Sequence, residues 1–262
     1  MSITSDPPAA RAKTEPSART LARGLSVLSV FDDGQPQMRA AEIAARAGLN
    51  RAATARVLRT LVSLGYLRCR DDLFSLAHQA LELGHGYIAG SPLVRASRRA
   101  VQWLTGEFNE PCTAGVLAGG DVICIAATRV PRMIRTGLTV GTRIPAHASS
   151  MGKVLVAGLS EDGLRPAVDG SLDRLTEQTI DSTWRFRQEI EQVRRQGYAV
   201  NNSELQPGHR TLSVPVRDGG GTVLAAVGVN MLATPDTLEA AIAGHLPLLR
   251  RAAEQITEGA TR

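Results

Sequence analysis

Residues Ser149–Lys153 read SSMGK, a combination of residue types that could catalyse a reaction or bind an anion. Ser150 and Lys153 have the S-x-x-K spacing of an acyl-enzyme serine and its lysine base. Gly152 and Lys153 also match the end of a phosphate-binding loop. A third interpretation requires no reaction, because serines here can begin a helix whose N-terminus faces a pocket.

Both catalytic interpretations lack their usual partners. The hydrolase pattern also requires S-D-N and K-T-G elements, which the sequence does not contain, and the only other lysine is Lys13. The phosphate loop requires a glycine five residues before Gly152, where His147 stands, and a Ser or Thr after the lysine, where valine follows. A serine N-cap is therefore favoured, since the free N–H groups and dipole of a helix N-terminus attract a carboxylate. A serine acyl-hydrolase remains the alternative.

Two further side chains near this segment could contact an anionic ligand. Arg135 lies on the approach to it and could bind a carboxylate through two parallel hydrogen bonds. His147 precedes the serines and could bond a phenolic oxygen. Each also has an ordinary interpretation, as a surface arginine and as a satisfied histidine at the end of a strand.

The composition of the whole chain limits the class of protein. With 262 residues, 43% of them apolar, the chain can form two compact domains with cores. No apolar run approaches the roughly 18 residues of a membrane span, and the polar N-terminus does not read as a secretion signal. The three cysteines are widely spaced without a C-x-x-C pair. We therefore expect a cytoplasmic protein with reduced thiols and with neither a metal ion nor a cofactor.

Positive charge is concentrated in the first part of the chain. Residues 1–75 hold 11 Lys and Arg against 7 Asp and Glu, a net charge of +4, whereas residues 76–262 hold 19 against 18. This distribution predicts a polyanionic partner for the first part. The basic residues are 28 Arg and only 2 Lys, a bias that in the rest of the chain can reflect base composition alone.

The first part also has the periodicity of a helix-turn-helix. A helical period runs from Leu21 to Phe31 through leucines at 25 and 28. A second helix is predicted in 39–48, with Ile43 and Ala44 facing inward and Gly48 ending it, and a third in 50–67. About four residues around a glycine separate the last two, which is the helix-turn-helix spacing.

The third helix separates into two faces. At 100° per residue, Ala53, Val57, Leu61 and Leu64 share the inner face. Small alanines between arginines on the outer face would let the backbone approach a DNA groove while guanidiniums reach phosphates or bases. The predicted DNA-binding residues are Arg51, Ala52, Ala55, Arg56 and Arg59.

Two short strands around Asp71 and Asp72 then form a plausible wing. An ordinary basic amphipathic helix is the alternative to the DNA-binding interpretation. The spacing, wing and charge together favour double-stranded DNA, and the 3% aromatic content disfavours RNA or single strands.

The second part alternates hairpins with helices. Residues 113–129 and 209–231 each read as two strands around a glycine-containing turn, and 138–145 as another strand. Helices are predicted at 92–108, 151–159, 183–196 and 235–258. Antiparallel hairpins flanked by helices indicate an α+β domain.

The sequence resembles the IclR-type transcriptional regulators over residues 19–257. The likeness is carried by AAEIAARAGLNRAATARVLRTLVSLGYL, SLAHQALELGHGYIAG, VGTRIPAHASSMGKVLVAGL and RRQGYAVNNSELQPGHRTLSVPVRDGGGTVLAAVGV. It is strongest to the branch that answers aromatic acids such as protocatechuate or 4-hydroxybenzoate. The expected organisation is a flexible tail (1–18), a winged helix-turn-helix domain (19–76), a linker helix (77–91) and an effector-binding and oligomerisation domain with a curved antiparallel sheet (92–262).

The resemblance also implies the effector contacts. Carried over position by position, they are Ser149, Ser150, Met151, Asn201, Thr211 and Asn230. The sequence departs from some relatives at Asn201, where an acid often stands, and at Gly228, where serine occurs. We expect a homodimer or a dimer of dimers that binds an operator under the control of a small carboxylate. A DNA-binding protein with no effector is a further alternative.

Overall fold

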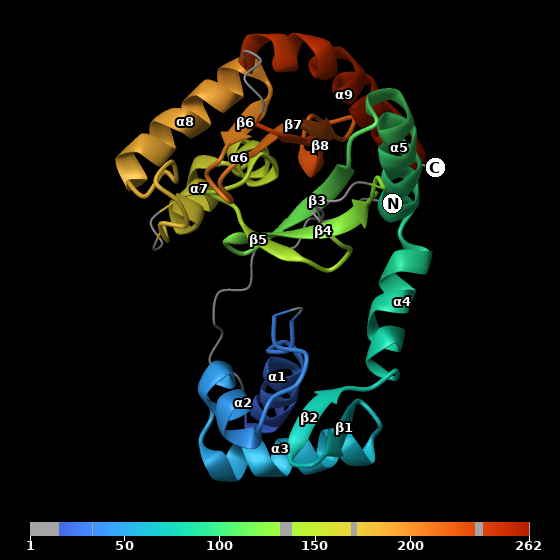
Figure 1. Cartoon of the computed structure of the whole chain (residues 1–262), viewed down its shortest axis with the longest axis vertical. Coiled ribbons are helices and arrows are strands. Elements are labelled where there is room, and N and C mark those ends of the chain that lie inside the picture. Colours follow the sequence, from blue (N-terminus) through green and yellow to red (C-terminus); the bar gives the residue numbers. More distant parts are fainter. Residues whose placement is uncertain (1–15, 33, 132–137, 169–171, 234–237, 262) are drawn as a thin grey trace. The chain divides into compact units, whose positions relative to one another are not determined.

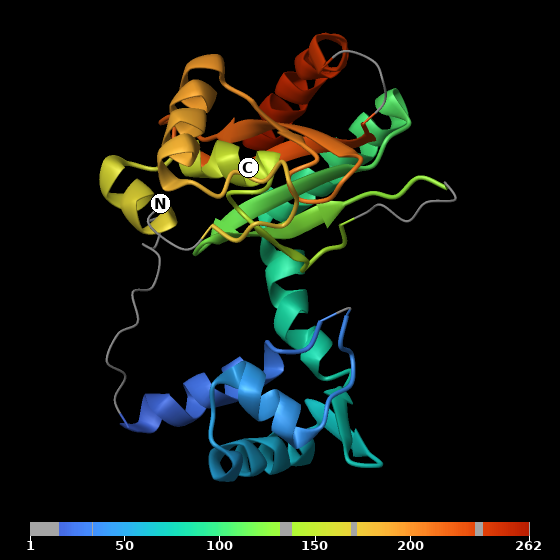
Figure 2. The same cartoon turned by 60° about the vertical axis from the view of Figure 1, so that its left-hand side comes forward.

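The computed structural model describes residues 16–32, 34–131, 138–168, 172–233 and 238–261. The chain divides after Gly90 into two compact units, Met1–Gly90 and Ser91–Arg262, which we call the N-terminal and the C-terminal unit. Figures 1 and 2 show the elements of each unit. Within the described ranges, no helix is both long enough and apolar enough to cross a membrane.

The N-terminal unit is a winged helix-turn-helix. Its elements are α1 (Pro16–Leu28), α2 (Ala40–Ala47), α3 (Arg51–Ser63), β1 (Leu67–Arg70), β2 (Leu73–Leu76) and α4 (Ala80–Gly90). Gly48 ends α2 in the left-handed conformation (φ 65°), which glycine adopts without steric cost. Three residues later α3 begins, with Asn50 as its N-cap. Helix α1 starts inside the segment predicted as a tail.

The wing is a tight hairpin. Strands β1 and β2 pair antiparallel, from Leu67 opposite Leu76 to Arg70 opposite Leu73. Asp71 and Asp72 form the turn with φ of 51° and 61°, the positive values that a two-residue type I′ turn requires. The Asp-Asp turn predicted from the sequence is therefore confirmed.

The core of this unit contains Val27, Ile43, Leu58 and Leu67, each at most 2% exposed. Three positions of the predicted periodicity are wrong. Leu21 and Leu25 are 67% and 51% exposed, and Val27 takes the inward position instead. Leu64 is also exposed, because α3 ends at Ser63 and Leu64 no longer belongs to the helix.

The C-terminal unit is an α+β domain with one antiparallel sheet. Its strands are β3 (Cys112–Ala118), β4 (Asp121–Ala127), β5 (Arg143–Pro145), β6 (Ala199–Asn202), β7 (His209–Arg217) and β8 (Val223–Leu232), in the order β5-β4-β3-β8-β7-β6. Its helices are α5 (Pro92–Phe108), α6 (Ser150–Ala157), α7 (Glu161–Val168), α8 (Thr183–Gln196) and α9 (Leu238–Ala260). The two predicted hairpins are confirmed as β3–β4 and β7–β8.

Helices pack on both faces of this sheet (Figure 1). Helices α5 and α9 lie side by side on one face. They approach closely at Gly259, since a Cβ added there would come within 2.8 Å of Ala96 Cβ. Helix α6 packs on the other face, with α8 against it, around a core that includes Val154, Phe186 and Ala226. The N-terminus of α6 therefore meets the sheet directly.

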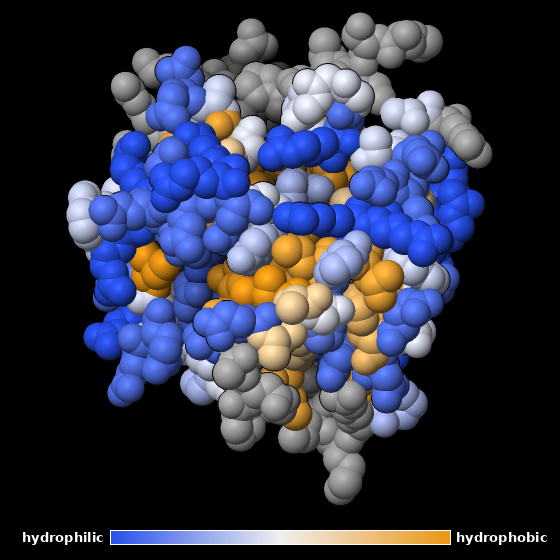
Figure 3. All heavy atoms as spheres, turned by 90° about the horizontal axis from the view of Figure 1, so that it is seen from above, coloured by the Kyte–Doolittle hydropathy of each residue, from blue (hydrophilic) through white to orange (hydrophobic). Residues whose placement is uncertain are grey.

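Figure 3 views the molecule from the side that carries α9. Hydrophilic side chains cover most of this face, and an apolar area lies among them. Leu238, Ile242 and Leu246 of α9 are only half-buried. The C-terminal unit thus exposes apolar side chains on its surface as well as packing them in its interior.

Candidate functional site

Helix α3 presents a basic face to solvent. The five residues predicted to bind DNA are all exposed: Arg51, Ala52, Ala55, Arg56 and Arg59. The other side of the helix is buried, including Ala53, Val57 and Leu61. Within the described ranges, no hydrogen bond or ion pair engages the three guanidiniums, so they are available to an external anion.

The start of α3 is fixed by its cap. The side-chain oxygen of Asn50 accepts a hydrogen bond from Ala53 N at 2.8 Å, and Thr54 Oγ1 donates to Asn50 O at 3.0 Å. These bonds set the direction of the first turn, which carries Arg51. The basic face is therefore held on a defined helix.

A cavity of about 240 Å³ lies where α6 meets the sheet in the C-terminal unit. It is lined by Thr113, Leu138, Ile144, Ser149, Ser150, Met151, Asn201, Leu205, Gln206, His209, Thr211, Ser213 and Asn230. Apolar side chains with a few polar groups are typical of sites for small organic ligands. The volume suits a small molecule.

Six of the predicted effector residues line this cavity: Ser149, Ser150, Met151, Asn201, Thr211 and Asn230. Arg135 falls outside the described residues. His147 does not line the cavity, which corrects our expectation that it would bond a ligand there. Its ring is buried, with Nε2 3.0 Å from Asp173 O and an edge-to-face contact with Phe186, so it is a satisfied histidine of the packed interior.

The N-terminus of α6 is built as the sequence predicted. Ser149 is the N-cap, and its Oγ accepts a hydrogen bond from Gly152 N at 3.0 Å. The next hydroxyl, Ser150 Oγ, lies 2.7 Å from Thr211 Oγ1 and 2.8 Å from Ser213 Oγ. The hydroxyl cluster Ser150–Thr211–Ser213 thus joins the first turn of α6 to strand β7.

Two amide side chains complete the polar lining. Asn230 Nδ2 donates to Pro111 O at 3.2 Å and to Thr113 Oγ1 at 3.4 Å. Asn201 Nδ2 donates to Ala148 O, and its Oδ1 accepts from Glu204 N at 3.1 Å. Both amides are therefore oriented by the protein before a ligand arrives.

Gly152 is required by a close backbone approach. A Cβ at this position would lie 2.2 Å from Ala146 O and 2.3 Å from Ala146 Cα. Gly228 is comparable, because a Cβ there would lie 2.2 Å from Ser213 Oγ. A serine at position 228 would therefore be incompatible with Ser213 in its present orientation.

Lys153 has a structural role that the sequence did not indicate. Its side chain is 1% exposed, and Nζ donates to Glu204 Oε1 at 2.7 Å, Glu189 Oε1 at 3.1 Å and Val200 O at 3.2 Å. These three acceptors use the three hydrogens of the ammonium. We call Lys153, Glu189 and Glu204 the ion triad.

The carboxyl of Glu204 is unusual within the ion triad. Burial raises its pKa above the ordinary value, and the positive charge of Lys153 opposes this shift only in part. Its Oε2 has no hydrogen-bond partner among the described residues. Because Asn201 bonds Glu204 N, the ion triad lies directly behind one wall of the cavity.

Sequence reasoning missed seven lining residues: Thr113, Leu138, Ile144, Leu205, Gln206, His209 and Ser213. A signal existed for two of them. Once Thr211 is placed on the ligand side of a strand, residues two positions away share its face, which indicates His209 and Ser213. Thr113 becomes a neighbour only through the sheet order, since both Thr113 and Ser213 pair with Gly228.

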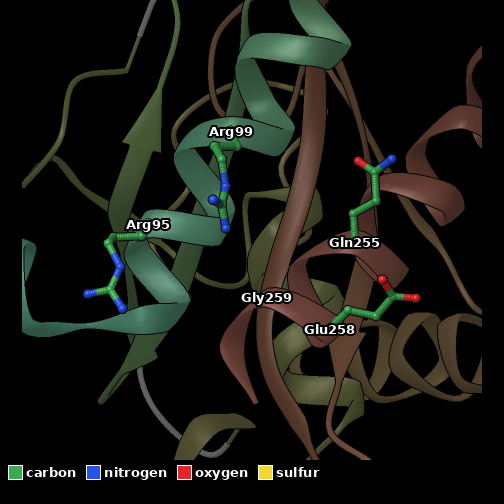
Figure 4. A pocket seen from close by; sticks show the side chains of 5 residues that line it. All are labelled: Arg95, Arg99, Gln255, Glu258 and Gly259. Carbon is green, nitrogen blue, oxygen red and sulfur yellow. The ribbon is translucent and has the colours of Figure 1, made fainter. Parts of the chain in front are cut away.

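A second depression, of about 500 Å³, lies between α5 and α9 (Figure 4). Its lining consists of Arg95 and Arg99 from α5 and of Gln255, Glu258 and Gly259 from α9. Although it is larger, no apolar side chain contributes to its lining. We therefore regard the smaller cavity at α6 as the ligand site.

The described residues contain no cluster of His, Cys, Asp and Glu that could hold a metal ion. Burial raises the pKa of the Cys112 thiol to about 12 and that of Cys124 to about 11. Such thiols stay protonated near neutral pH, so they are poor nucleophiles and poor metal ligands.

Two families match the two units of the chain. Residues 20–71 match the IclR helix-turn-helix domain. Residues 85–258 match the family described as bacterial transcriptional regulator IclR C-terminal. Together the matches span both the basic helix and the cavity.

Individual proteins are similar over most of the chain. The Pca regulon regulatory protein of Pseudomonas putida is 35% identical over 80% of this chain and 73% of its own length. The p-hydroxybenzoate hydroxylase transcriptional activator of Acinetobacter baylyi is 29% identical over 93% and 92%. The crystal structure of an IclR homolog from Microbacterium hydrocarbonoxydans, complexed with 4-hydroxybenzoate, covers 92% of this chain and 99% of its own at 23% identity, with a TM-score of 0.76.

Proposed function

The chain belongs to the IclR family of bacterial transcriptional regulators, and from this premise we propose that α3 binds operator DNA and that the α6 cavity binds a small aromatic acid which controls that binding. The observation that carries the proposal is that the basic helix and the cavity lie in different units. One unit displays unpaired arginines on a helix-turn-helix, and the other encloses a cavity with oriented polar groups.

On the DNA side, α3 enters a major groove. Arg51, Arg56 and Arg59 contact phosphates and base edges, and the small side chains of Ala52 and Ala55 let the backbone come close. Two copies of the chain place two such helices on the half-sites of a pseudo-palindromic operator. The proposed assembly is therefore a homodimer or a dimer of dimers.

On the ligand side, the carboxylate lies at the N-terminus of α6. Free N–H groups and the helix dipole favour an anion there. The relatives include a Pca regulon regulatory protein, a p-hydroxybenzoate hydroxylase transcriptional activator and an IclR homolog complexed with 4-hydroxybenzoate. Their names support 4-hydroxybenzoate or protocatechuate as the class of effector. Arg135 stays a predicted carboxylate contact on the basis of sequence alone.

Control of DNA binding requires two arrangements of the protein with unequal affinity for the ligand. The proposed arrangements differ in the geometry of the oligomer and hence in the spacing of the α3 helices. We further propose that the protein catalyses no reaction. The Lys153 ammonium donates its hydrogens to Glu189, Glu204 and Val200, so it is not free to act as a base for Ser150.

The DNA-binding assignment is tested by reversing one charge. Arg56→Glu should weaken operator binding, since a lost contact to a base or phosphate is worth roughly 1–3 kcal/mol and the new carboxylate repels the backbone. A mobility-shift titration measures the change at fixed salt. Arg98→Glu, the same change at an exposed arginine of α5, is the matched control and should leave affinity unaltered. Unchanged affinity in Arg56→Glu would show that α3 is not the contact helix.

The effector assignment is tested by calorimetric titration and thermal shift with a panel of aromatic acids and small keto acids. A ligand present at 100 times its Kd should stabilise the protein by about 2.7 kcal/mol. Absence of any response would favour a DNA-binding protein without an effector. Labelling of Ser150 by an acyl-serine probe would instead favour the hydrolase.

A further inference from the structure

His209 is the first residue of β7, and its ring lines the α6 cavity. Its Nδ1 lies 3.1 Å from the carbonyl oxygen of Pro207. Because a carbonyl oxygen can only accept a hydrogen bond, Nδ1 must carry the proton. In the neutral ring Nε2 is then a hydrogen-bond acceptor.

This Nε2 is buried and has no hydrogen-bond partner among the described residues. A buried acceptor without a donor is unfavourable, because it has lost its hydrogen bonds to water and gained none from the protein. The nitrogen is therefore an acceptor that a bound molecule can satisfy.

Apart from the exposed Gln206, the other polar lining residues each make at least one side-chain hydrogen bond. The hydroxyl cluster of Ser150, Thr211 and Ser213 is bonded internally, and Ser149 caps α6. Asn201 and Asn230 bond backbone oxygens. Of the described lining residues, His209 alone has a titratable side chain.

We propose that His209 determines effector specificity by accepting a hydrogen bond from a hydroxyl group of the ligand. The inference rests on the proposed effector function and adds to it the residue that recognises the ring hydroxyl of such an aromatic acid. Opposite the neutral ring a ligand carboxylate would find no donor, since the carboxylate and Nε2 are both acceptors, so we place the hydroxyl here and the carboxylate elsewhere. It goes to the N-terminus of α6, where donors are available.

The test compares two ligands in three proteins by isothermal titration calorimetry of the full chain. The ligands are 4-hydroxybenzoate and benzoate, which differ only in the hydroxyl. The proteins are the unaltered chain, His209→Leu, and His85→Leu, the same change at an exposed histidine of α4 that does not line the cavity. Operator binding and melting temperature are measured alongside, to establish that each variant folds.

We expect the unaltered chain to prefer 4-hydroxybenzoate to benzoate by at least tenfold. His209→Leu should reduce this preference to within about twofold, mainly through weaker binding of 4-hydroxybenzoate, and His85→Leu should retain it. His209→Gln, which keeps an acceptor oxygen, should recover part of the preference.

Four results would overturn the assignment. An unchanged preference in His209→Leu would show that another group contacts the hydroxyl. An equal loss of affinity for both ligands would show that the ring contacts the carboxylate or shapes the cavity. Equal binding of both ligands by the unaltered chain would reject the role of His209 while leaving the proposed function intact, whereas binding of neither would reject both.

Discussion

Helices α3 and α6 begin in the same way and then serve opposite purposes. Each has a short polar N-cap, Asn50 or Ser149, whose side chain accepts a hydrogen bond from the backbone N–H three residues later. Beyond the cap, α3 turns one side to solvent, whereas seven of the eight residues of α6 are buried. Local capping rules therefore define where a helix starts, and tertiary burial decides what its side chains can do.

The difference is clearest for the basic residues. Arg56 and Arg59 of α3 are exposed and can exchange water for a partner's phosphates. Lys153 of α6 is enclosed with two carboxylates. All three hydrogens of this buried ammonium are donated within the protein, so none is left for a ligand.

The largest effect should come from removing the buried cation. Lys153→Met leaves the buried carboxylate of Glu204 and the half-buried carboxylate of Glu189 without their partner, and breaking a buried ion pair typically costs about 3–5 kcal/mol. Urea unfolding followed by tryptophan fluorescence is a suitable measurement, because both tryptophans, Trp103 and Trp184, lie in the C-terminal unit.

Two controls accompany this variant. Arg143→Met breaks a surface ion pair with Asp121 and should cost less than about 1 kcal/mol. Arg59→Met on α3 should leave the fluorescence transition unchanged. A loss below 1 kcal/mol in Lys153→Met would mean that its burial contributes little, and the contrast between the helices would fail.

A smaller loss is expected from adding one methyl group to α6. Gly152→Ala forces the new Cβ against the backbone of Ala146, and overpacking of this kind costs roughly 1–3 kcal/mol. The same change at Gly163 in α7 meets only ordinary contacts, the nearest at 3.5 Å, and should stabilise by up to about 1 kcal/mol. If both alanine variants unfold alike, the close approach at Gly152 is not a constraint.

The smallest effect should be a dependence of stability on pH. Burial raises the pKa of Glu204 above its ordinary value of 4.5, so the folded protein keeps this proton where the unfolded chain has lost it. Because the folded state then binds more protons, the contribution of Glu204 to the free energy of unfolding should fall as pH rises from 4.5 through the folded-state pKa.

Urea midpoints between about pH 5 and pH 8 measure this slope in the unaltered chain and in Glu204→Gln. The glutamine cannot titrate, so the variant should lose this part of the slope. Parallel curves for the two proteins would assign the pH dependence to another group.

Elements with local signals were predicted well. The helices at 92–108 and 183–196 have the predicted bounds, because Pro92 stands in the first turn of α5 and Gly197 adopts the left-handed conformation that ends α8. Helix α7 and strand β6 were not predicted. They are short, and β6 is defined by its pairing with β7 and not by a pattern of its own.

The candidate site shows the same limit. Ser149 was identified as a cap from adjacent residues, whereas the choice between His147 and His209 depends on which face of a distant strand borders the cavity. Lys153 meets partners 36 and 51 positions away along the chain. Contacts over such separations leave no mark on the local pattern, so the burial of this lysine could not be foreseen.

The hydroxyl cluster of Ser150, Thr211 and Ser213 has one more consequence. In each of its two hydrogen bonds either oxygen can be the donor, so the row can reverse its polarity by rotating three protons while no heavy atom moves. The hydroxyl cluster can therefore bond either a donor or an acceptor group of a ligand. The cavity can thus accept ligands with different polar groups at this position. Selectivity must then come from side chains whose donor or acceptor role is fixed.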